Sequence, residues 1–283
     1  MNRSWCHAES GKSKLLHRLE RKVHSMANYR AEEYYDYQKI KENLYNRAIQ
    51  GERFHDILSM ILEENNLRMS HRKIKGNKGS KTKGSDIYTI EDVKCTSLGK
   101  YLHWMRTWLL DYQPKPVRRK YIPKPNGDKR PLGIPCIRDR LLQQSVLQIL
   151  EPMLEAKMSQ HSFGFRKGKS VQDAIEYSRN LVRLGNYIAV DFDIRKCFDT
   201  IPHNPLIAVL WKNGICDKRV LMVIKKMLKA PVKENGELTE PEKGTPQGGI
   251  VTPLTQEQHF VNRYNMANQN FIFTSIHQYL FYQ

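Results

Sequence analysis

The sequence lacks several features that mark common protein classes. It has five cysteines in 283 residues, and no Cys-x-x-Cys pair occurs. Neither a disulfide framework nor a zinc site is therefore indicated. The N-terminal stretch has no apolar core, and no apolar run approaches the ~20 residues that cross a bilayer. We predict a soluble, cytoplasmic protein with reduced thiols and no membrane partner.

Acidic residues are also scarce. The chain holds 29 Asp and Glu against 47 Lys and Arg, which gives a net charge of +18. The positive charge gathers in two runs, Arg68–Lys83 and Lys115–Arg140. A basic but ordinary surface would spread its charge more evenly, whereas a track for a polyanion concentrates it. The distribution favours a nucleic-acid partner.

What is present indicates an α+β chain, because helical and strand patterns alternate. A Ser170–Asp173 capping box predicts the start of a helix whose buried face includes Val171, Ala174, Ile175, Ser178, Leu181 and Val182. Asp217 is the predicted N-cap of a further amphipathic helix. Further helices are expected around 54–62, 98–112 and 137–158, and a buried strand over 187–192.

Two glycine-containing stretches predict turns or loops. The Gly76–Asp86 stretch mixes three Gly with three Lys, which predicts a mobile loop or linker. Tyr121–Pro135 predicts two short strands around a Pro-Asn-Gly-Asp turn, because Asn-Gly supplies the positive φ angles of a tight hairpin. Its prolines predict an edge position in the sheet. This hairpin would project Lys120, Lys124, Lys129 and Arg130.

Three groups of residues could carry chemistry. Asp191 and Asp193 lie two apart at the end of the predicted strand, so their carboxylates share one face and would suit Mg²⁺, although either could instead cap a turn. Lys124 and Arg130 flank the hairpin turn and could hold a polyphosphate, or be plain surface charge. The PQGG stretch, Pro246–Gly249, allows backbone to approach a flat substrate, or forms a simple turn.

In their order along the chain, these stretches resemble the successive blocks of group II intron reverse transcriptases, also called maturases. The resemblance runs from about Lys41 to Leu254. It rests on KENLYNRAIQ with GNKGSKTKGSD, YQPKPVRRKYIPKPNGDKRPLGIPCIRDRLLQQ, ILEPMLEAKMSQHSFGFRKGKS, VDFDIRKCFDTIPH and KGTPQGG. The implied fold is a partial right-hand polymerase, with fingers and an incomplete palm, that carries a helical N-terminal extension.

The resemblance implies a role for each candidate residue. Asp193 matches the first catalytic, metal-binding Asp of the palm. The nucleotide-binding set comprises Lys124 and Arg130 on the triphosphate, Phe198 as the aromatic gate at the sugar, and Gln247 at the nascent base pair. The set near template or intron RNA comprises Lys78, Lys81, Lys83, Arg166, Lys167 and Lys169.

The implied chemistry is RNA-directed DNA synthesis by two-metal phosphoryl transfer, with a maturase role in splicing. It implies two Mg²⁺ ions as cofactors. The implied partners are group II intron RNA, an RNA template with a DNA primer, and dNTPs, and a homodimer is left open. The division predicted for the chain is an unassigned polar segment (1–40), the extension (41–86), the fingers (87–185), a partial palm (186–254) and a divergent tail (255–283).

The sequence departs from the family pattern after Leu254. The family completes its metal site with a Tyr-x-Asp-Asp hairpin, whereas this sequence contains no Asp-Asp. Residues 255–283 hold nine Asn or Gln and seven aromatics, and only one acid and one Arg. We expect a truncated or frame-disrupted copy that cannot polymerise alone. A non-catalytic RNA-binding protein is the main alternative, and a nuclease built on Asp191 and Asp193 is a remote one.

Overall fold

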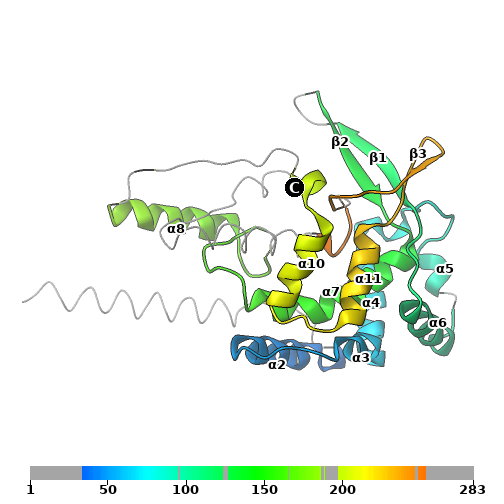
Figure 1. The fold of residues 1–283 in the computed structure, drawn as a ribbon, viewed down its shortest axis with the longest axis horizontal. Coiled ribbons are helices and arrows are strands. Elements are labelled where there is room, and N and C mark those ends of the chain that lie inside the picture. Colours follow the sequence, from blue (N-terminus) through cyan, green and yellow to red (C-terminus); the bar gives the residue numbers. More distant parts are fainter. Residues whose placement is uncertain are drawn as a thin grey trace, which may run out of the picture.

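The computed structural model describes residues 34–94, 96–123, 127–164, 166–185, 188, 197–245 and 248–252. It is an α+β structure, which confirms the predicted class (Figure 1). Its helices are η1 (Tyr34–Asp36), α2 (Tyr37–Ile49), α3 (Ile57–Leu62), α4 (Glu64–Gly76), η2 (Lys78–Lys81), α5 (Ile90–Lys94), α6 (Leu98–Leu110), α7 (Ile137–Glu155), α8 (Val171–Arg183), α9 (Cys197–Thr200), α10 (His203–Lys212) and α11 (Lys218–Leu228). Its strands are β1 (Val117–Pro123), β2 (Lys129–Ile134), β3 (Val232–Glu234) and β4 (Glu237–Thr239).

Helix α7 is the centre of the hydrophobic core, between α2 and α3 on one side and α10 and α11 on the other in Figure 1. It is buried almost all round, and it packs against α2, α3 and α4. The core cluster draws on residues from Leu44 to Val251. Within the described ranges, no helix combines the length and the apolar character needed to cross a membrane.

Buried polar side chains of the core are hydrogen-bonded across helices. Gln148 of α7 donates to the Asn66 side-chain oxygen at 2.7 Å, and Asn66 of α4 donates to the Ser145 carbonyl at 3.0 Å. Tyr37 of α2 donates to the Gln148 carbonyl at 2.9 Å. Because unpaired buried polar groups are costly, these bonds fix how α2, α4 and α7 are positioned relative to one another.

Asp217 caps two helices, where the sequence predicted one. Its Oδ1 accepts the Arg219 backbone N–H at 3.0 Å, which caps α11 as expected. Its Oδ2 accepts the N–H groups of Ile57 and Leu58 at 3.0 Å each, at the start of α3. Burial alone would raise the pKa of Asp217, but bonds from Arg219 and Leu58 outweigh it and lower the pKa.

The four strands form one sheet in the order β2-β1-β3-β4. β1 and β2 make the predicted antiparallel hairpin, with Ile122 opposite Arg130. The hairpin lies at the edge of the sheet, as predicted, with β2 as the edge strand. β1 also pairs in parallel with β3, through Val117 and Arg118, which precede the predicted stretch Tyr121–Pro135. The proline at the end of β1, Pro123, lies beyond this second pairing and so does not obstruct it.

Helix α8 begins with the predicted capping box, in which Ser170 and Asp173 bond reciprocally. Its predicted buried face was wrong for most members. Ala174 is buried, whereas Ile175 is 40% exposed and Val182 is 52% exposed. Among the described elements, none packs closely against α8. In Figure 1 it lies to the side of the helical core.

The predicted loop over Gly76–Asp86 was partly wrong, because α4 continues through Gly76 and η2 follows. Its carbonyl oxygens have specific donors. Arg140 of α7 donates to the carbonyls of Gly79, at 2.8 Å, and Thr82. Arg118 of β1 donates to the Lys83 carbonyl at 2.6 Å. Composition could not reveal these donors, since they lie 35 to 61 residues away.

Candidate nucleotide and nucleic-acid site

The segment from Gly244 to Thr252 contains the PQGG stretch and joins three parts of the fold. Its first part bonds to the end of α9. Gly244 N donates to the Ile201 carbonyl at 2.7 Å, and Thr245 N donates to the Phe198 carbonyl at 2.7 Å. The buried His203 of α10 has its Nε2 2.7 Å from the Gly244 carbonyl, as a donor to it. These bonds hold the loop against the residue predicted as the aromatic gate.

The second part of the segment lies against the β1–β2 hairpin. Gly248 has a φ of +109°, and a Cβ there would lie 2.6 Å from the Gly133 carbonyl oxygen of β2. Only glycine fits both this conformation and this approach. Ile250 N then donates to Gln143 Oε1 of α7 at 2.9 Å. The loop is thus held between α7, α9 and β2.

The structure therefore brings three of the sequence blocks together. Phe198 lies on α9 and is half-buried, and Arg130 lies on β2 and is half-buried. Both elements contact the loop that carries PQGG. Lys124, Gln247, Asp191 and Asp193 lie outside the described residues, so their roles stay predictions.

In the block Ser159–Ser170, the cations predicted to bind RNA form ion pairs and hydrogen bonds with other residues of the chain. Arg166 is nearly buried, pairs with Glu155 at 2.6 Å and donates to the Ser159 and Ser162 carbonyls. Lys167 pairs with Glu151 at 2.6 Å. Each of these cations has an intramolecular partner, and their contact with phosphate stays a prediction.

Lys169 lies 4.6 Å from the centre of the Phe163 ring and donates to the Gln160 carbonyl. Burial, followed by the nearby Arg166, lowers the pKa of the Lys169 ammonium. A lysine held in this way stabilises the loop between α7 and α8, and its charge is partly satisfied before any ligand arrives.

The cations of the Gly/Lys stretch are placed differently. Lys78, Lys81 and Lys83 are all exposed, on and just after η2. The Lys81 ammonium lies 3.9 Å from Glu91, at the limit of an ion pair. Because Arg140 and Arg118 hold the backbone of this stretch, its lysine side chains extend from a fixed base toward solvent. Such an arrangement suits contact with a phosphate backbone.

Asp139 of α7 is a buried carboxylate. Tyr112 donates to Asp139 Oδ1 at 2.8 Å, while Oδ2 is buried without a partner among the described residues. Burial raises the pKa of Asp139 to about 7. Since its side chain is only 2% exposed, we expect Asp139 to act on folding stability.

Metal ligands are not gathered in the described part of the chain. No group of three or more His, Cys, Asp or Glu side chains there could hold an ion. Asp193 and Asp191, the candidates from the sequence, lie outside it. The described geometry therefore assigns no metal ligand.

Sequence reasoning missed the residues that hold the PQGG loop in place. Gln143 and His203 lie 107 and 41 residues from their loop partners, on α7 and α10. The one available signal was polar residues on otherwise apolar helix faces, which must find partners when buried.

Comparison with known proteins decides the family. Residues 122–282 match the family model described as reverse transcriptase (RNA-dependent DNA polymerase). The chain belongs to the reverse transcriptase family. This match covers more than half of the chain, and it includes the hairpin, α9 and the loop that carries PQGG.

Relatives with intron-related names support the resemblance to group II intron proteins. The chain is 34% identical over 200 residues to the putative COX1/OXI3 intron 1 protein of Saccharomyces cerevisiae, covering 70% of the chain and 24% of that protein. It is 36% identical over 187 residues to the group II intron-encoded protein LtrA of Lactococcus lactis, covering 66% of the chain and 31% of LtrA. The chain thus spans a quarter to a third of these relatives.

A solved structure is also similar. A chain of the partial Cas6-RT-Cas1–Cas2 complex is superposed with a TM-score of 0.47 at 23% identity, covering 71% of this chain and 33% of that one.

Proposed function

We propose that this reverse transcriptase chain provides the nucleotide-binding and RNA-binding part of an RNA-directed DNA polymerase encoded by a mobile group II intron. The observation that carries the proposal is the loop from Gly244 to Thr252. It bonds to the Phe198 turn, lies against the hairpin of Arg130, and is anchored to α7 by Gln143. Three parts of the proposed nucleotide site would thereby share one support.

Each residue would have a defined task. Arg130, with Lys124 across the hairpin turn, would hold the triphosphate of the incoming dNTP, since a forked guanidinium binds two oxygens at once. Phe198 would pack on the sugar and disfavour a 2′-hydroxyl. Gln247 would line the new base pair. Lys78, Lys81 and Lys83 would contact the template backbone.

Reverse transcriptases generally use Mg²⁺, and here Asp193, helped by Asp191, would hold it. The ions would stabilise the attacking and leaving oxygens of phosphoryl transfer. These two carboxylates would form only half of a two-ion site, because the 283 residues contain no Asp-Asp. We therefore propose that the 283-residue chain, alone, binds its ligands without extending a primer.

The alternative is a non-catalytic protein that binds intron RNA and assists splicing in the cytoplasm, as a monomer or a homodimer. The net charge of +18 favours RNA binding under both proposals. They differ in whether the dNTP site is used. The alternative predicts no dNTP binding at the hairpin.

The test is a dNTP titration of the chain bound to an RNA template annealed to a DNA primer, with Mg²⁺ present. Arg130→Ala should weaken dNTP binding by roughly ten- to a hundredfold, which corresponds to the ~1.5–3 kcal/mol of a hydrogen bond to a charged group. Gly248→Ala should also weaken it, because the added Cβ would force the loop away from Gly133.

The matched control is Lys218→Ala, which removes one exposed positive charge at the start of α11. It should leave the dNTP affinity unchanged. Equal affinities of the Arg130 variant, the control and the unmodified chain would overturn the nucleotide site and leave the RNA-binding alternative. Primer extension by the unmodified chain would overturn the proposal that it is inactive alone.

A further inference from the structure

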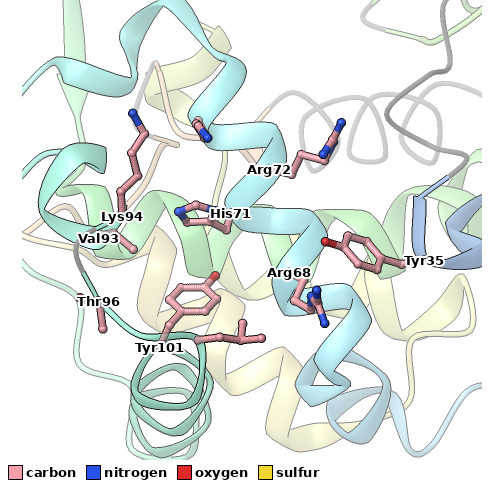
Figure 2. Close-up of a pocket in the computed structure, with 10 residues that line it drawn as sticks. Tyr35, Arg68, His71, Arg72, Val93, Lys94, Thr96 and Tyr101 are labelled. Atoms are coloured by element: carbon pink, nitrogen blue, oxygen red, sulfur yellow. The ribbon is translucent and has the colours of Figure 1, made fainter.

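A pocket of about 290 Å³ lies on the far side of α4 from α7, between α4, α5 and the start of α6 (Figure 2). Its volume is at the lower end of the ~300–1,000 Å³ range of ligand pockets. The residues that line it combine cations and rings and include no carboxylate: Tyr35, Arg68, His71, Arg72, Lys75, Val93, Lys94, Thr96, Leu98 and Tyr101.

Two of the four cations are already neutralised. Arg68 pairs with Glu64 at 3.1 Å, and Lys94 pairs with Glu91 at 2.6 Å. Arg72 and Lys75 are exposed, and among the described residues neither forms an ion pair with a carboxylate. The Arg72 guanidinium stacks on the Tyr34 ring, 3.6 Å from its centre, and this contact leaves its positive charge in place. They are three residues apart on α4, so they project from neighbouring positions on the helix surface. The pocket therefore has positive charge for an anionic ligand.

The wall of the pocket is aromatic. The His71 ring lies 5.6 Å from the Tyr101 ring in an edge-to-face arrangement, and Figure 2 shows both facing the pocket. The Tyr101 hydroxyl donates to the Leu67 carbonyl at 3.0 Å, which fixes its ring. Burial, and then Lys75 and Lys94, lower the pKa of His71, which favours the uncharged form of its ring. A neutral flat ring beside cations suits base stacking.

We infer that this pocket binds one nucleotide of single-stranded RNA, with the base against His71 and the flanking phosphates on Arg72 and Lys75. The inference deepens the proposed RNA-binding function and rests on it. The pocket lies on α4, at the beginning of the basic run Arg68–Lys83, which contains no acid. An RNA strand held there would continue toward Lys78 and Lys81 on η2.

The experiment measures the affinity of the full 283-residue chain for a labelled single-stranded RNA of about 12 nucleotides, within the ~4–16 that single-strand-binding folds cover. Affinity is measured over a series of salt concentrations. The Arg72→Gln/Lys75→Gln double variant should lose about tenfold in affinity at low salt. Its log–log salt slope should fall by about 1.4, for two phosphates at ~0.7 each.

The control removes the same charge from the first residue and the C-cap of α11, Lys218 and Lys229. Lys218→Gln/Lys229→Gln changes two exposed lysines outside the pocket and should keep the affinity and the salt slope. Both double variants change exposed side chains, so both should fold, which circular dichroism checks. An equal loss in the two double variants, or no loss in either, would overturn the pocket.

A second part of the experiment tests base stacking on His71. His71→Ala should weaken binding roughly tenfold, while His71→Phe, which keeps a flat ring, should bind as the unmodified chain does. An RNA of the same length with abasic sites should show no difference between these variants. A loss that persists on abasic RNA, or an acidic peptide that competes as well as RNA does, would overturn the nucleotide assignment.

The outcomes separate the two proposals. If the unmodified chain binds no RNA, both the pocket and the proposed RNA-binding function fail. If it binds RNA tightly and the pocket variants match their control, the pocket alone fails.

Discussion

Helices α8 and α11 are both amphipathic, but the rest of the fold surrounds them very differently. Both are amphipathic and of similar length, and both are capped by residues that the sequence identified. α11 buries six apolar side chains against the core: Val220, Leu221, Val223, Ile224, Met227 and Leu228. α8 buries Ala174 alone. The pattern of a helix therefore predicts which face is apolar, and the rest of the fold decides what contacts it.

The largest expected effect is a difference in unfolding free energy between substitutions on the apolar faces of α11 and α8. Ile224→Ala should lower the free energy of unfolding by about 2–5 kcal/mol, because it leaves a cavity at a side chain that is 1% exposed. Ile175→Ala on α8 should change it by about 0.5 kcal/mol or less, since that side chain is already 40% exposed. Urea unfolding of both variants measures the difference. Equal losses would mean that α8 is packed as firmly as α11.

The second effect compares the caps. Asp217→Ala removes the acceptor at the start of both α3 and α11 and should cost about 2–3 kcal/mol, whereas Ser170→Ala removes one cap and should cost about 1 kcal/mol. Thermal unfolding of both variants at pH 7 gives the comparison.

The Asp217 contribution should also depend on pH. Because its folded pKa is lowered, its stabilisation is complete above the unfolded value of about 3.9 and is lost as the pH falls through the folded pKa. Asp217→Ala should therefore differ less from the unmodified chain in acid. A difference that stays constant below pH 4 would contradict the cap as an ionised acceptor.

The smallest effect concerns α7, the core helix. The folded pKa of Asp139 is raised to about 7, so the folded chain keeps a proton that the unfolded chain releases near pH 4. Stability from this group is highest below about pH 4 and is lost as the pH rises to about 7. Asp139→Asn should remove that loss, on the order of 1–2 kcal/mol after relaxation softens the burial penalty. Urea unfolding at pH 5 and pH 8 tests it, and an unchanged pH dependence in the variant would contradict it.

The sequence identified much of the fold and part of the candidate site. The capping box at Ser170, the cap at Asp217 and the Asn-Gly hairpin depend on local chemistry, and local chemistry is visible in a sequence. The contacts of Gln143 and Arg140 depend on tertiary packing and are not. Gly76–Asp86 shows the same limit, since its glycines predicted a loop while distant arginines hold its backbone.

The candidate site also has a part that the sequence indicated and a part that only the fold shows. The resemblance to group II intron reverse transcriptases implied that Arg130, Phe198 and Gln247 belong to one nucleotide site. Spacing alone could not show that the loop from Gly244 bonds to the Phe198 carbonyl and lies against Gly133 of the hairpin. Those contacts come from a close backbone approach that only the folded chain presents.

The most direct test of whether the hairpin and the PQGG loop share one nucleotide site is photoaffinity labelling with an azido-dNTP. The chain is bound to an RNA–DNA template–primer with Mg²⁺. Peptide mapping then locates the label. We expect the label on both the β1–β2 hairpin and the loop Gly244–Thr252, and we expect Arg130→Ala to reduce it at both. Label that avoids either element, or that Arg130→Ala leaves unchanged, would contradict a shared nucleotide site.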